Sequence, residues 1–530
     1  MYPRIHALAV ACILFIGALA SLPAHAQKQG GILRVYHRDS PASMSIHEEG
    51  TISAVMPVMG VFNNLVMYDQ HVPQNSLDSI VPDLATSWAW NKEFTELTFK
   101  LRQGVNWHDG KPFTSADVKC TFDLLTGKAT EKLKVNFRAN WFTNIVETVT
   151  NGPDQAIFRF KQPQPAFLAL LASGFTPVYP CHVSVRDMRQ NPIGTGPFKF
   201  VEFKANQSMK VARNPNYWKP GLPYLDGIEY TIIPNRSTAI LGFVSGKFDL
   251  TFPFEVSIPL LKDVKNQMPE AVCQVTPTNT APNVLMNPSP PFDDLRLRRA
   301  VAMALDRKAF IDIMGEGQGD VGGAMLPTPA GVWGLPPEIL KTLPGFSGNV
   351  QASREEARAT MRTLGYGPDK HLKVKMSTRN IPTYRDAAVL LMDQLKEIWI
   401  DGELELIETA TWVPKLIRRE YQIALSVVGN GVDEPDQQFF ENYVCGSRTY
   451  MDYCNKDLDA LVNQQSMEPD QEKRKRLVWE IDRRLQVDAV RPMLYFIRAG
   501  TCWRPEVKNL TLMVNSTFNG WRMEDVWLDR

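Results

Sequence analysis

Two short stretches of this sequence carry residue types that could do chemistry. Gly242 to Lys247 (GFVSGK) is similar to a phosphate-binding loop, but it has one spacer residue too few, and Phe248 stands where Ser or Thr should hold magnesium. His47 precedes two glutamates but lacks the second histidine of a zinc protease. The nucleophile elbow G-x-S-x-G occurs nowhere in the chain. We therefore predict a helix-to-strand turn at Gly242 to Lys247, and we identify no catalytic nucleophile.

A third stretch, His108-Asp109-Gly110, could supply half of an acid/base pair. It lies between two strand-like runs, where Asp-Gly is typical of a turn in which Asp bonds its own backbone. The chain also has no CxxC motif and no Cys/His cluster at zinc-ligand spacing. We therefore expect no catalytic residue, no metal and no cofactor. The alternative from this class is a secreted hydrolase whose triad is dispersed along the chain.

The composition is that of a folded protein with almost no net charge. The 530 residues include 58 Lys and Arg against 57 Asp and Glu, and 44% are hydrophobic. This apolar content excludes disorder as the main state, and the charge balance argues against nucleic acid or an anionic membrane as the main partner. A chain of this length should divide into several domains, because single cores stop growing at roughly 250–300 residues.

The N-terminus is typical of a secretory signal. Arg4 gives a short basic start, Ala7 to Leu22 is an apolar run, and Ala24-His25-Ala26 is an A-x-A cleavage site. The apolar run is too short to span a bilayer, which needs roughly 20 residues. We therefore interpret residues 1–26 as a signal peptide and expect a soluble periplasmic protein that begins at Gln27.

Six cysteines remain after this signal: Cys120, Cys181, Cys273, Cys445, Cys454 and Cys502. An even number in an exported chain permits three disulfides, and six cysteines allow fifteen pairings. Cys445 and Cys454 enclose a short loop that contains Gly, Ser and Asn, so we expect them to be bonded. We also expect Cys120 to be bonded to Cys181, although the sequence alone leaves the pairing of the other four cysteines open.

The predicted elements differ between the two halves of the chain. Short runs rich in β-branched and aromatic residues predict strands in the first half: Gly31–Tyr36, Leu97–Leu101, Ile157–Lys161, Phe198–Phe203, Met209–Arg213 and Ile228–Ile233. Apolar residues at helical spacing predict helices in the second half: Asp294–Leu305, a helix opened by a capping box at Ser353 and ended by Gly365, Asp386–Ile398 and Asp470–Leu485. Glu403–Glu408 is strand-like, and the Pro-rich stretches Thr276–Asn287 and Leu326–Pro344 are interpreted as linkers or long loops. The fold class is therefore α/β, with a strand-rich first part.

Several motifs resemble the family 5 extracellular solute-binding proteins, which are the dipeptide, oligopeptide and nickel receptors of ABC importers. The first signature region is matched by Val81–Trp88 (VPDLATSW), Leu97–Gly104 (LTFKLRQG) and Trp107–Val118 (WHDGKPFTSADV). Further matches follow in the order of the family: Ile193–Phe198, Arg213–Trp218, Ser245–Asp249, Pro291–Ala300 and Ala304–Arg307. Each motif alone is weak, but their order along the chain is specific.

The resemblance implies a two-lobed periplasmic binding protein with an extra subdomain in its first lobe. Lobe I is expected to comprise residues 27–280 and 500–530, with a strand-rich subdomain inserted at roughly 62–192, and lobe II residues 281–499. The chain is expected to cross between lobes near Thr276–Asn287 and Phe496–Cys502. Such a molecule closes around its solute by hinge motion. The implied partners are an inner-membrane ABC permease and its cytoplasmic ATPase, and we expect a monomer that is not an enzyme.

The resemblance also indicates residues that would contact the solute. Arg379 lies where some short-peptide receptors bind the ligand carboxylate, and a guanidinium suits a planar carboxylate through two parallel hydrogen bonds. The stretch that binds the peptide amine corresponds here to Val428–Asp436, in which an ungapped match puts Gly431 at the position of the amine-binding Asp, whereas a short shift puts Asp433 there. Trp412 matches a family position near the ligand, and Asn430 lies in the same stretch as Asp433. Asp39 and Ser40 are candidates on other grounds, because they follow the first predicted strand and open α/β sheets bind ligands at strand ends.

Two kinds of solute stay open at this point. A short peptide needs both an amine and a carboxylate partner, which Asp433 and Arg379 would supply. A receptor of the same fold could instead take an organic acid, an oligosaccharide or a metal chelate.

Overall fold

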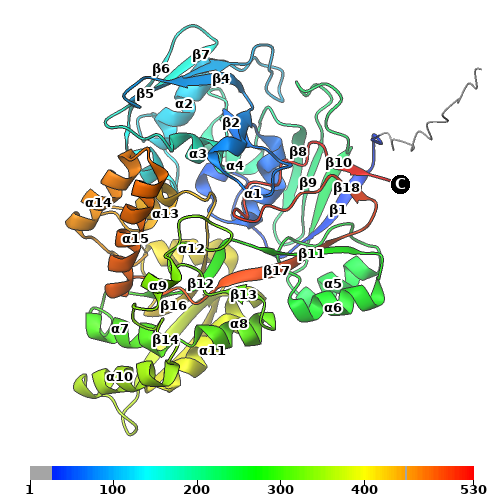
Figure 1. Cartoon of the computed structure of the whole chain (residues 1–530). Coiled ribbons are helices and arrows are strands. Elements are labelled where there is room, and N and C mark those ends of the chain that lie inside the picture. The colour runs from blue at the N-terminus through cyan, green and yellow to red at the C-terminus, as the bar shows by residue number, and fades with distance from the viewer. Residues whose placement is uncertain (1–26, 448–449) are drawn as a thin grey trace, which may run out of the picture.

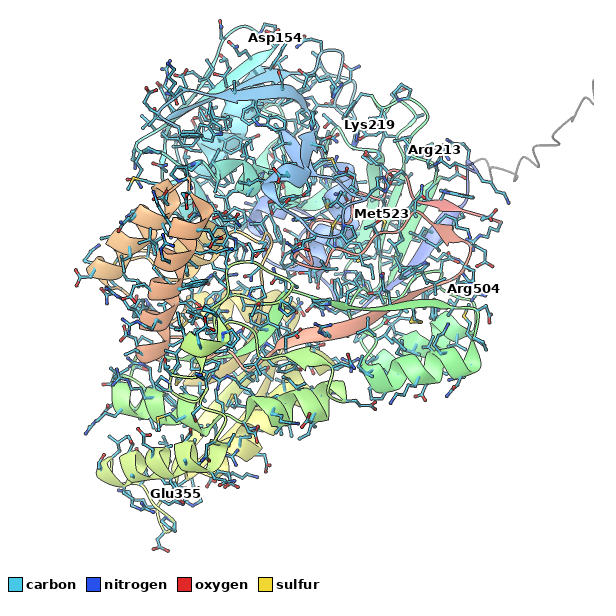
Figure 2. The ribbon with its side chains drawn as sticks, viewed as in Figure 1. Asp154, Arg213, Lys219, Glu355, Arg504 and Met523 are labelled. Atoms are coloured by element: carbon cyan, nitrogen blue, oxygen red, sulfur yellow. A yellow bond between two sulfur atoms is a disulfide. The ribbon has the colours of Figure 1, made fainter. Side chains whose placement is uncertain are left out.

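The computed structural model describes residues 27–447 and 450–530, and the predicted signal peptide lies outside them. Buried apolar side chains form three large groups. The first core combines residues 33–62, 175–271 and 502–528, the second lies within 281–496, and the third lies within 65–178 together with Val432. The molecule is elongated: Asp154, in the turn between two strands of the third core, and Glu355, on a helix of the second, lie at opposite ends (Figure 2).

The first core is built on a mixed four-stranded sheet (Figure 1). Its strands, in spatial order, are β1 (Ile32–His37), β10 (Gly227–Ile232), β9 (Ser208–Arg213) and β8 (Phe198–Lys204). Strand β1 runs parallel to β10, and the other two pairs are antiparallel. Leu33, Val35 and Tyr36 of β1 are buried in this core, whereas Ile32 at the start of the strand is exposed.

The second core surrounds another mixed four-stranded sheet. Its strands, in spatial order, are β12 (Thr280–Met286), β16 (Ile423–Gly429), β14 (Leu372–Arg379) and β15 (Ile400–Ile407). Strands β14, β15 and β16 are parallel, and β12 runs antiparallel to β16. The predicted linker at Thr276–Asn287 is therefore wrong, because most of it forms β12; Pro282 lies in this strand although it lacks an N–H group.

Two strands run from one core to the other. Strand β11 (Val272–Pro277) leads out of the first core into β12, and β17 (Phe496–Trp503) returns antiparallel to β11. The turn between β11 and β12 is held by Thr278, whose main-chain N donates to the carbonyl oxygen of Ile497 at 3.1 Å. The two passages of the chain thus lie side by side, which is the arrangement that a hinge requires.

The third core belongs to an antiparallel sheet at the far end of the molecule (Figure 1). Its strands, in spatial order, are β4 (Ala85–Trp90), β5 (Glu96–Leu101), β7 (Gln155–Phe160) and β6 (Ile145–Thr150). Helix α2 (Ser115–Leu125) packs on it and is capped by Thr114 and Asp117 in a capping box. Gly110 adopts a positive φ of 90° and donates to the Trp107 carbonyl oxygen, so the predicted Asp-Gly turn is confirmed.

The predicted helices of the second half are present, but two of them begin earlier than predicted. Helix α7 (Leu295–Ala304) begins after Asp294, and α15 (Gln471–Val487) begins after Asp470, each capped by that aspartate. Helix α10 (Val350–Thr363) begins four residues earlier than predicted, because its cap is Asn349, whose side chain accepts from the Ala352 N–H, and not Ser353. Helix α11 (Pro382–Lys396) also begins before its predicted start.

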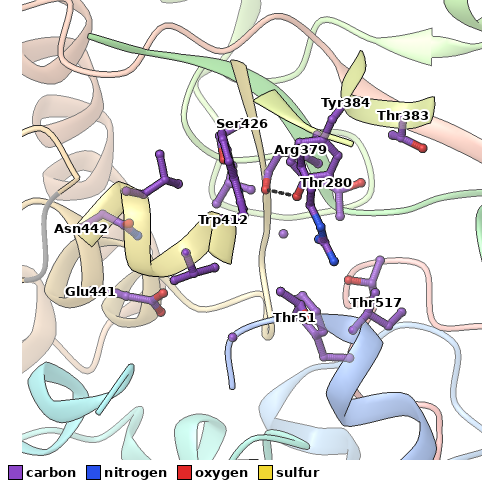
Figure 3. Close-up of a pocket in the computed structure, with 18 of the residues that line it drawn as sticks. Thr51, Thr280, Arg379, Thr383, Tyr384, Trp412, Ser426, Glu441, Asn442 and Thr517 are labelled. Carbon is purple, nitrogen blue, oxygen red and sulfur yellow. Dashed lines mark hydrogen bonds between the residues drawn. The ribbon is translucent and has the colours of Figure 1, made fainter. Parts of the chain in front are cut away.

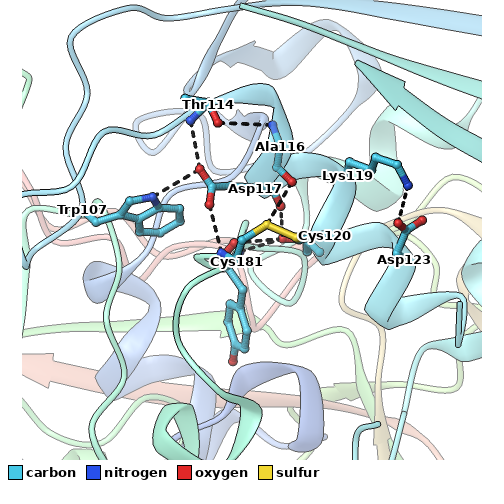
Figure 4. The surroundings of a disulfide bond; sticks show 10 residues. Trp107, Thr114, Ala116, Asp117, Lys119, Cys120, Asp123 and Cys181 are labelled. Atoms are coloured by element: carbon cyan, nitrogen blue, oxygen red, sulfur yellow. Dashed lines mark hydrogen bonds and ion pairs between the residues drawn. A yellow bond between two sulfur atoms is a disulfide. The ribbon is translucent and has the colours of Figure 1, made fainter. Parts of the chain in front are cut away.

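Three disulfides join the six cysteines. The predicted pairs Cys120–Cys181 and Cys445–Cys454 are confirmed, and Cys273–Cys502 is the third. The Asp117 carboxylate accepts hydrogen bonds from the main-chain N of Cys181 and from the main-chain N of Thr114, both at 2.9 Å (Figure 4). Cys273 and Cys502 are directly paired in the register of β11 and β17, so the third disulfide ties together the two strands that connect the cores.

Candidate functional site

A cavity of about 150 Å³ lies between the first and second cores (Figure 3). Thr51, at the start of helix α1 (Ile52–Val58), and Phe518 line it from the first core. Residues that line it from the second core's elements include Thr280 on β12, Tyr384 on α11 and Ser426 on β16. Because both cores contribute, a molecule in this cavity would contact both at once.

The sheet of the second core explains why polar groups gather at this place. Strand β14 ends at Arg379 and the parallel strand β16 ends at Gly429, and both residues line the cavity. Ligands of α/β sheets bind at the carboxyl ends of the strands, where the side chains of successive connections converge. The cavity therefore lies where this topology favours binding.

Arg379 is held by a carboxylate from the other core. Its side chain is 1% exposed, and its Nη2 is bonded to the Asp39 carboxylate. Its Nε donates to Thr409 Oγ1 at 2.8 Å, and Thr409 in turn donates to Asp39 Oδ2 at 2.6 Å. Burial opposes ionisation of Asp39, but the positive charges of Arg379 and Arg38 outweigh it and hold the pKa of this carboxyl well below its ordinary value.

Trp412 lies on helix α12 (Thr409–Ile417) and forms part of the apolar wall of the cavity. It is 2% exposed, and its ring meets Tyr384 edge to face, with ring centroids 6.2 Å apart. The Tyr384 hydroxyl donates to the Val427 carbonyl oxygen at 3.3 Å. The structure thus brings the predicted residues Arg379, Asp39 and Trp412 together around one site.

Asp433, Asn430 and Ser40 do not line this cavity in the structure. Asp433 Oδ2 accepts from the Val332 N–H at 3.1 Å and from Asn515 Nδ2 at 3.3 Å. Burial raises the pKa of Asp433 to about 7 in spite of these hydrogen bonds. The Asp433 carboxyl thus has hydrogen-bond partners within the protein, and it does not line the cavity beside Arg379.

The other two residues are likewise bound by the protein. The Asn430 side chain is buried and accepts a hydrogen bond from Gln438, while its main-chain N donates to the Asn279 carbonyl oxygen. Ser40 Oγ accepts from the Asn206 N–H at 3.2 Å. Both residues therefore have hydrogen-bond partners within the protein.

Charged residues that sequence reasoning did not single out also line the cavity. They are three arginines and one glutamate: Arg38, Arg138, Arg491 and Glu441. Arg38 is paired with Glu255 from its own core, and Glu441 accepts from Trp141 Nε1 at 3.2 Å. Arg491 stands alone as a charge in the apolar run from Ala489 to Phe496, which is the one sequence signal that could have indicated it.

A second cavity of about 620 Å³ adjoins the first. The two share Gly50, Thr51 and Val413, and the larger one continues along α12 to Ile417. The space at the junction of the cores is therefore longer than the first cavity alone.

The described part of the chain offers no ready metal or membrane site. Within residues 27–447 and 450–530, no three or more His, Cys, Asp or Glu side chains are grouped so that they could hold a metal ion. In the same residues, every helix is too short or too polar to cross a bilayer.

Comparison with known proteins gives consistent matches over most of the chain. The model of the bacterial extracellular solute-binding proteins, family 5 Middle, matches residues 79–450. Di/tripeptide-binding protein 2 of Pseudomonas aeruginosa is 26% identical over 438 residues, which are 76% of this chain and 79% of the relative. Heme-binding protein A of Haemophilus influenzae is also 26% identical, over 435 residues and 76% of each chain. Sequence identity alone therefore does not distinguish a peptide from a metal chelate as solute.

A solved structure shows the same fold. The periplasmic binding protein DppA of Helicobacter pylori, determined with the peptide STSA, superposes with a TM-score of 0.83 over 95% of this chain and 99% of that chain, at 19% identity. This likeness confirms the predicted α/β, two-lobed fold.

Proposed function

Because the chain belongs to family 5 of the bacterial extracellular solute-binding proteins, we propose that it binds a short peptide or peptide-like solute between two lobes and delivers it to an ABC permease. Lobe I would comprise the first and third cores, and lobe II the second core, with β11 and β17 as the connection. After removal of residues 1–26 the chain would work in the periplasm as a monomer, without catalytic activity. The permease would sit in the inner membrane and be driven by a cytoplasmic ATPase.

One observation carries the choice of a peptide. Strand β16 pairs with β14 only over Ile423–Leu425, and in the described chain no other strand takes the place of β14 along the next four residues, 426–429. All four of these residues line the cavity. A peptide can add to such a strand edge through main-chain hydrogen bonds. An oligosaccharide or a metal chelate lacks the regularly spaced N–H and C=O groups that such hydrogen bonds require.

The surroundings of this strand edge are also suited to peptide side chains. Trp412, Tyr384 and Phe518 give the cavity aromatic walls, and the adjoining cavity along α12 extends the space. Side chains of both charge signs line this cavity, among them Arg491 and Glu441. The relative named as a di/tripeptide-binding protein is consistent with this assignment.

Calorimetry of the mature chain tests the proposal. Tri-alanine should bind. Tri-alanine that carries an N-methyl group on the amide nitrogen of its second residue should bind at least tenfold more weakly, because it loses a main-chain N–H donor. Maltotriose serves as the neutral control. A ligand at roughly 100 times its Kd adds about 2.7 kcal/mol to the free energy of unfolding, so thermal shifts can screen further peptides first. Binding of maltotriose, or equal binding of both tri-alanine forms, would contradict the proposal.

A further inference from the structure

Arg491 places an almost fully buried guanidinium against the cavity. The residue follows helix α15 and lies in the second core, its side chain is 2% exposed, and it lines the cavity between the cores. Its Nε donates to Asn283 Oδ1 at 2.8 Å, and its Nη1 donates to Asn442 Oδ1 at 3.0 Å. Its remaining neighbours are the Tyr443 hydroxyl and the face of Tyr450, whose centroid lies 5.9 Å from its Cζ. All these partners are neutral.

Two of the other arginines that line the cavity are paired with carboxylates. Arg379 is paired with Asp39, and Arg38 is paired with Glu255. In the part of the chain that the structure describes, no carboxylate lies within ion-pair distance of Arg491. A buried charge without a counter-charge is costly, and an anionic solute in this cavity would supply the missing counter-charge.

The two asparagines orient this arginine without neutralising it. Asn283 Nδ2 donates to the carbonyl oxygens of Ala281 and Ser426, at 3.0 and 3.1 Å. Asn442 Nδ2 donates to the Gln438 carbonyl oxygen at 3.2 Å. Since both amide nitrogens are committed to acceptors, both amide oxygens must face the guanidinium. A guanidinium has five N–H groups, so at least two remain after the asparagines and Tyr443.

We propose that Arg491 binds the carboxylate of the solute. The inference rests on the proposed function and narrows it to a peptide or peptide-like molecule with an ionised carboxylate. Arg379, which the sequence resemblance indicated for this role, is already bound across the cores by Asp39. Arg491 offers what Arg379 lacks: an oriented, desolvated guanidinium whose own partners are neutral, so that a charge-assisted hydrogen bond to a carboxylate gains its full strength.

The test compares an acid with its neutral analogue on the full mature chain. Calorimetry with tri-alanine and tri-alanine amide should show that the wild type binds the acid at least tenfold more tightly. Arg491→Gln should reduce affinity for the acid at least tenfold and change affinity for the amide less than twofold. Arg491→Lys should keep part of the preference for the acid, because it keeps the charge. Arg307→Gln is the matched control: Arg307 is also buried, bonds main-chain oxygens of Met493 and Gly345, and lies outside this cavity.

Each outcome decides between the two proposals. Equal binding of acid and amide by the wild type, or an undiminished preference for the acid in Arg491→Gln, would overturn the role of Arg491. If tri-alanine does not bind but succinate binds and depends on Arg491, the carboxylate site stands and the peptide function fails. If neither carboxylate binds, the inference is overturned. If circular dichroism shows that Arg491→Gln does not fold, the role of Arg491 is decided by two other measurements. These are the ratio of wild-type affinities for tri-alanine and tri-alanine amide, and the same ratio in Arg491→Lys.

Discussion

Arg379 and Asp39 form a buried ion pair that joins the second core to the first, 340 positions apart in the sequence. Arg379 is the last residue of β14, and Asp39 follows β1 by two residues. Thr409 and Ser53 complete the contact with hydroxyl groups from each side. In the proposed two-lobed receptor, this pair can form only when the lobes are in contact, so it would stabilise the closed arrangement.

We therefore expect Asp39→Asn to make closure more difficult. Removing one partner of a buried ion pair typically costs about 3–5 kcal/mol, because the other charge stays buried and uncompensated. This cost falls on the closed state, so the apparent affinity for a solute should decrease at least tenfold. Small-angle scattering during a tri-alanine titration should show the decrease in radius of gyration at correspondingly higher peptide concentration.

Asp249→Asn is the control for this experiment. Asp249 is also a buried, ion-paired carboxylate, but its partners Arg34 and Arg530 lie on the same side of the molecule. Asp249→Asn should have a lower free energy of unfolding than the wild type. The peptide concentration at which half of the molecules have closed should be unchanged. Closure of Asp39→Asn at the wild-type peptide concentration would show that the pair does not contribute to closure.

The sequence predicted local features well and the site only partly. The helices predicted to start near Asp294 and Asp470 are present, and each of these aspartates caps its helix, because a cap depends on residues only two or three positions away. The cap at Asn349 was missed because Asn349 and Ser353 are both favoured N-cap residues. A helix that starts after either of them satisfies the local sequence pattern.

The missing parts of the site depend on distant contacts. The partners that orient Arg491 lie 208 and 49 positions away, at Asn283 and Asn442, and nothing in the local sequence links them. The same applies to Asp39, whose role follows from its contact with Arg379. Family resemblance indicated Arg379, which lies at the end of β14 beside the cavity, but its pairing with Asp39 is a property of the folded chain.

The disulfide between β11 and β17 should matter most for stability. Cys273 and Cys502 are separated by 229 positions, whereas Cys445 and Cys454 are separated by 9. Restriction of the unfolded chain grows with loop length, and loss of a disulfide typically costs roughly 2–5 kcal/mol. Replacing Cys273 and Cys502 by Ser should therefore lower the free energy of unfolding by more than replacing Cys445 and Cys454. Denaturation in urea would measure both, and an equal loss would contradict the prediction.

Asp482 should make the protein less stable at alkaline pH. It is fully buried on α15 and accepts from the Met325 N–H and from Gln486 Nε2, both at 3.0 Å, and burial raises its pKa to about 8. The unfolded chain loses this proton near pH 4, so between the two values the folded chain holds the extra proton. The free energy of unfolding therefore falls as the pH rises across this range.

Asp482→Asn should remove this dependence, because the amide oxygen still accepts hydrogen bonds and the side chain cannot ionise. Urea denaturation should show a larger gain over wild type at about pH 9 than at about pH 5. Asp393→Asn, at an exposed carboxylate on α11, is the control and should show no such difference. A constant offset between Asp482→Asn and wild type at all pH values would mean that Asp482 ionises normally.

The last prediction separates the residues that line the cavity from those that sequence resemblance alone suggested. Trp412 forms part of the cavity wall and packs edge to face on Tyr384, whereas Asp433 is bound by Val332 and Asn515 away from it. Truncating a large buried aromatic at a binding surface typically costs 2 kcal/mol or more, roughly thirtyfold in affinity. Trp412→Leu should therefore weaken tri-alanine binding by at least tenfold, and Asp433→Asn should change it less than twofold, with both variants folded by circular dichroism. The opposite pattern, a strong effect of Asp433→Asn and none of Trp412→Leu, would place the peptide amine at Asp433 and move the binding site away from this cavity.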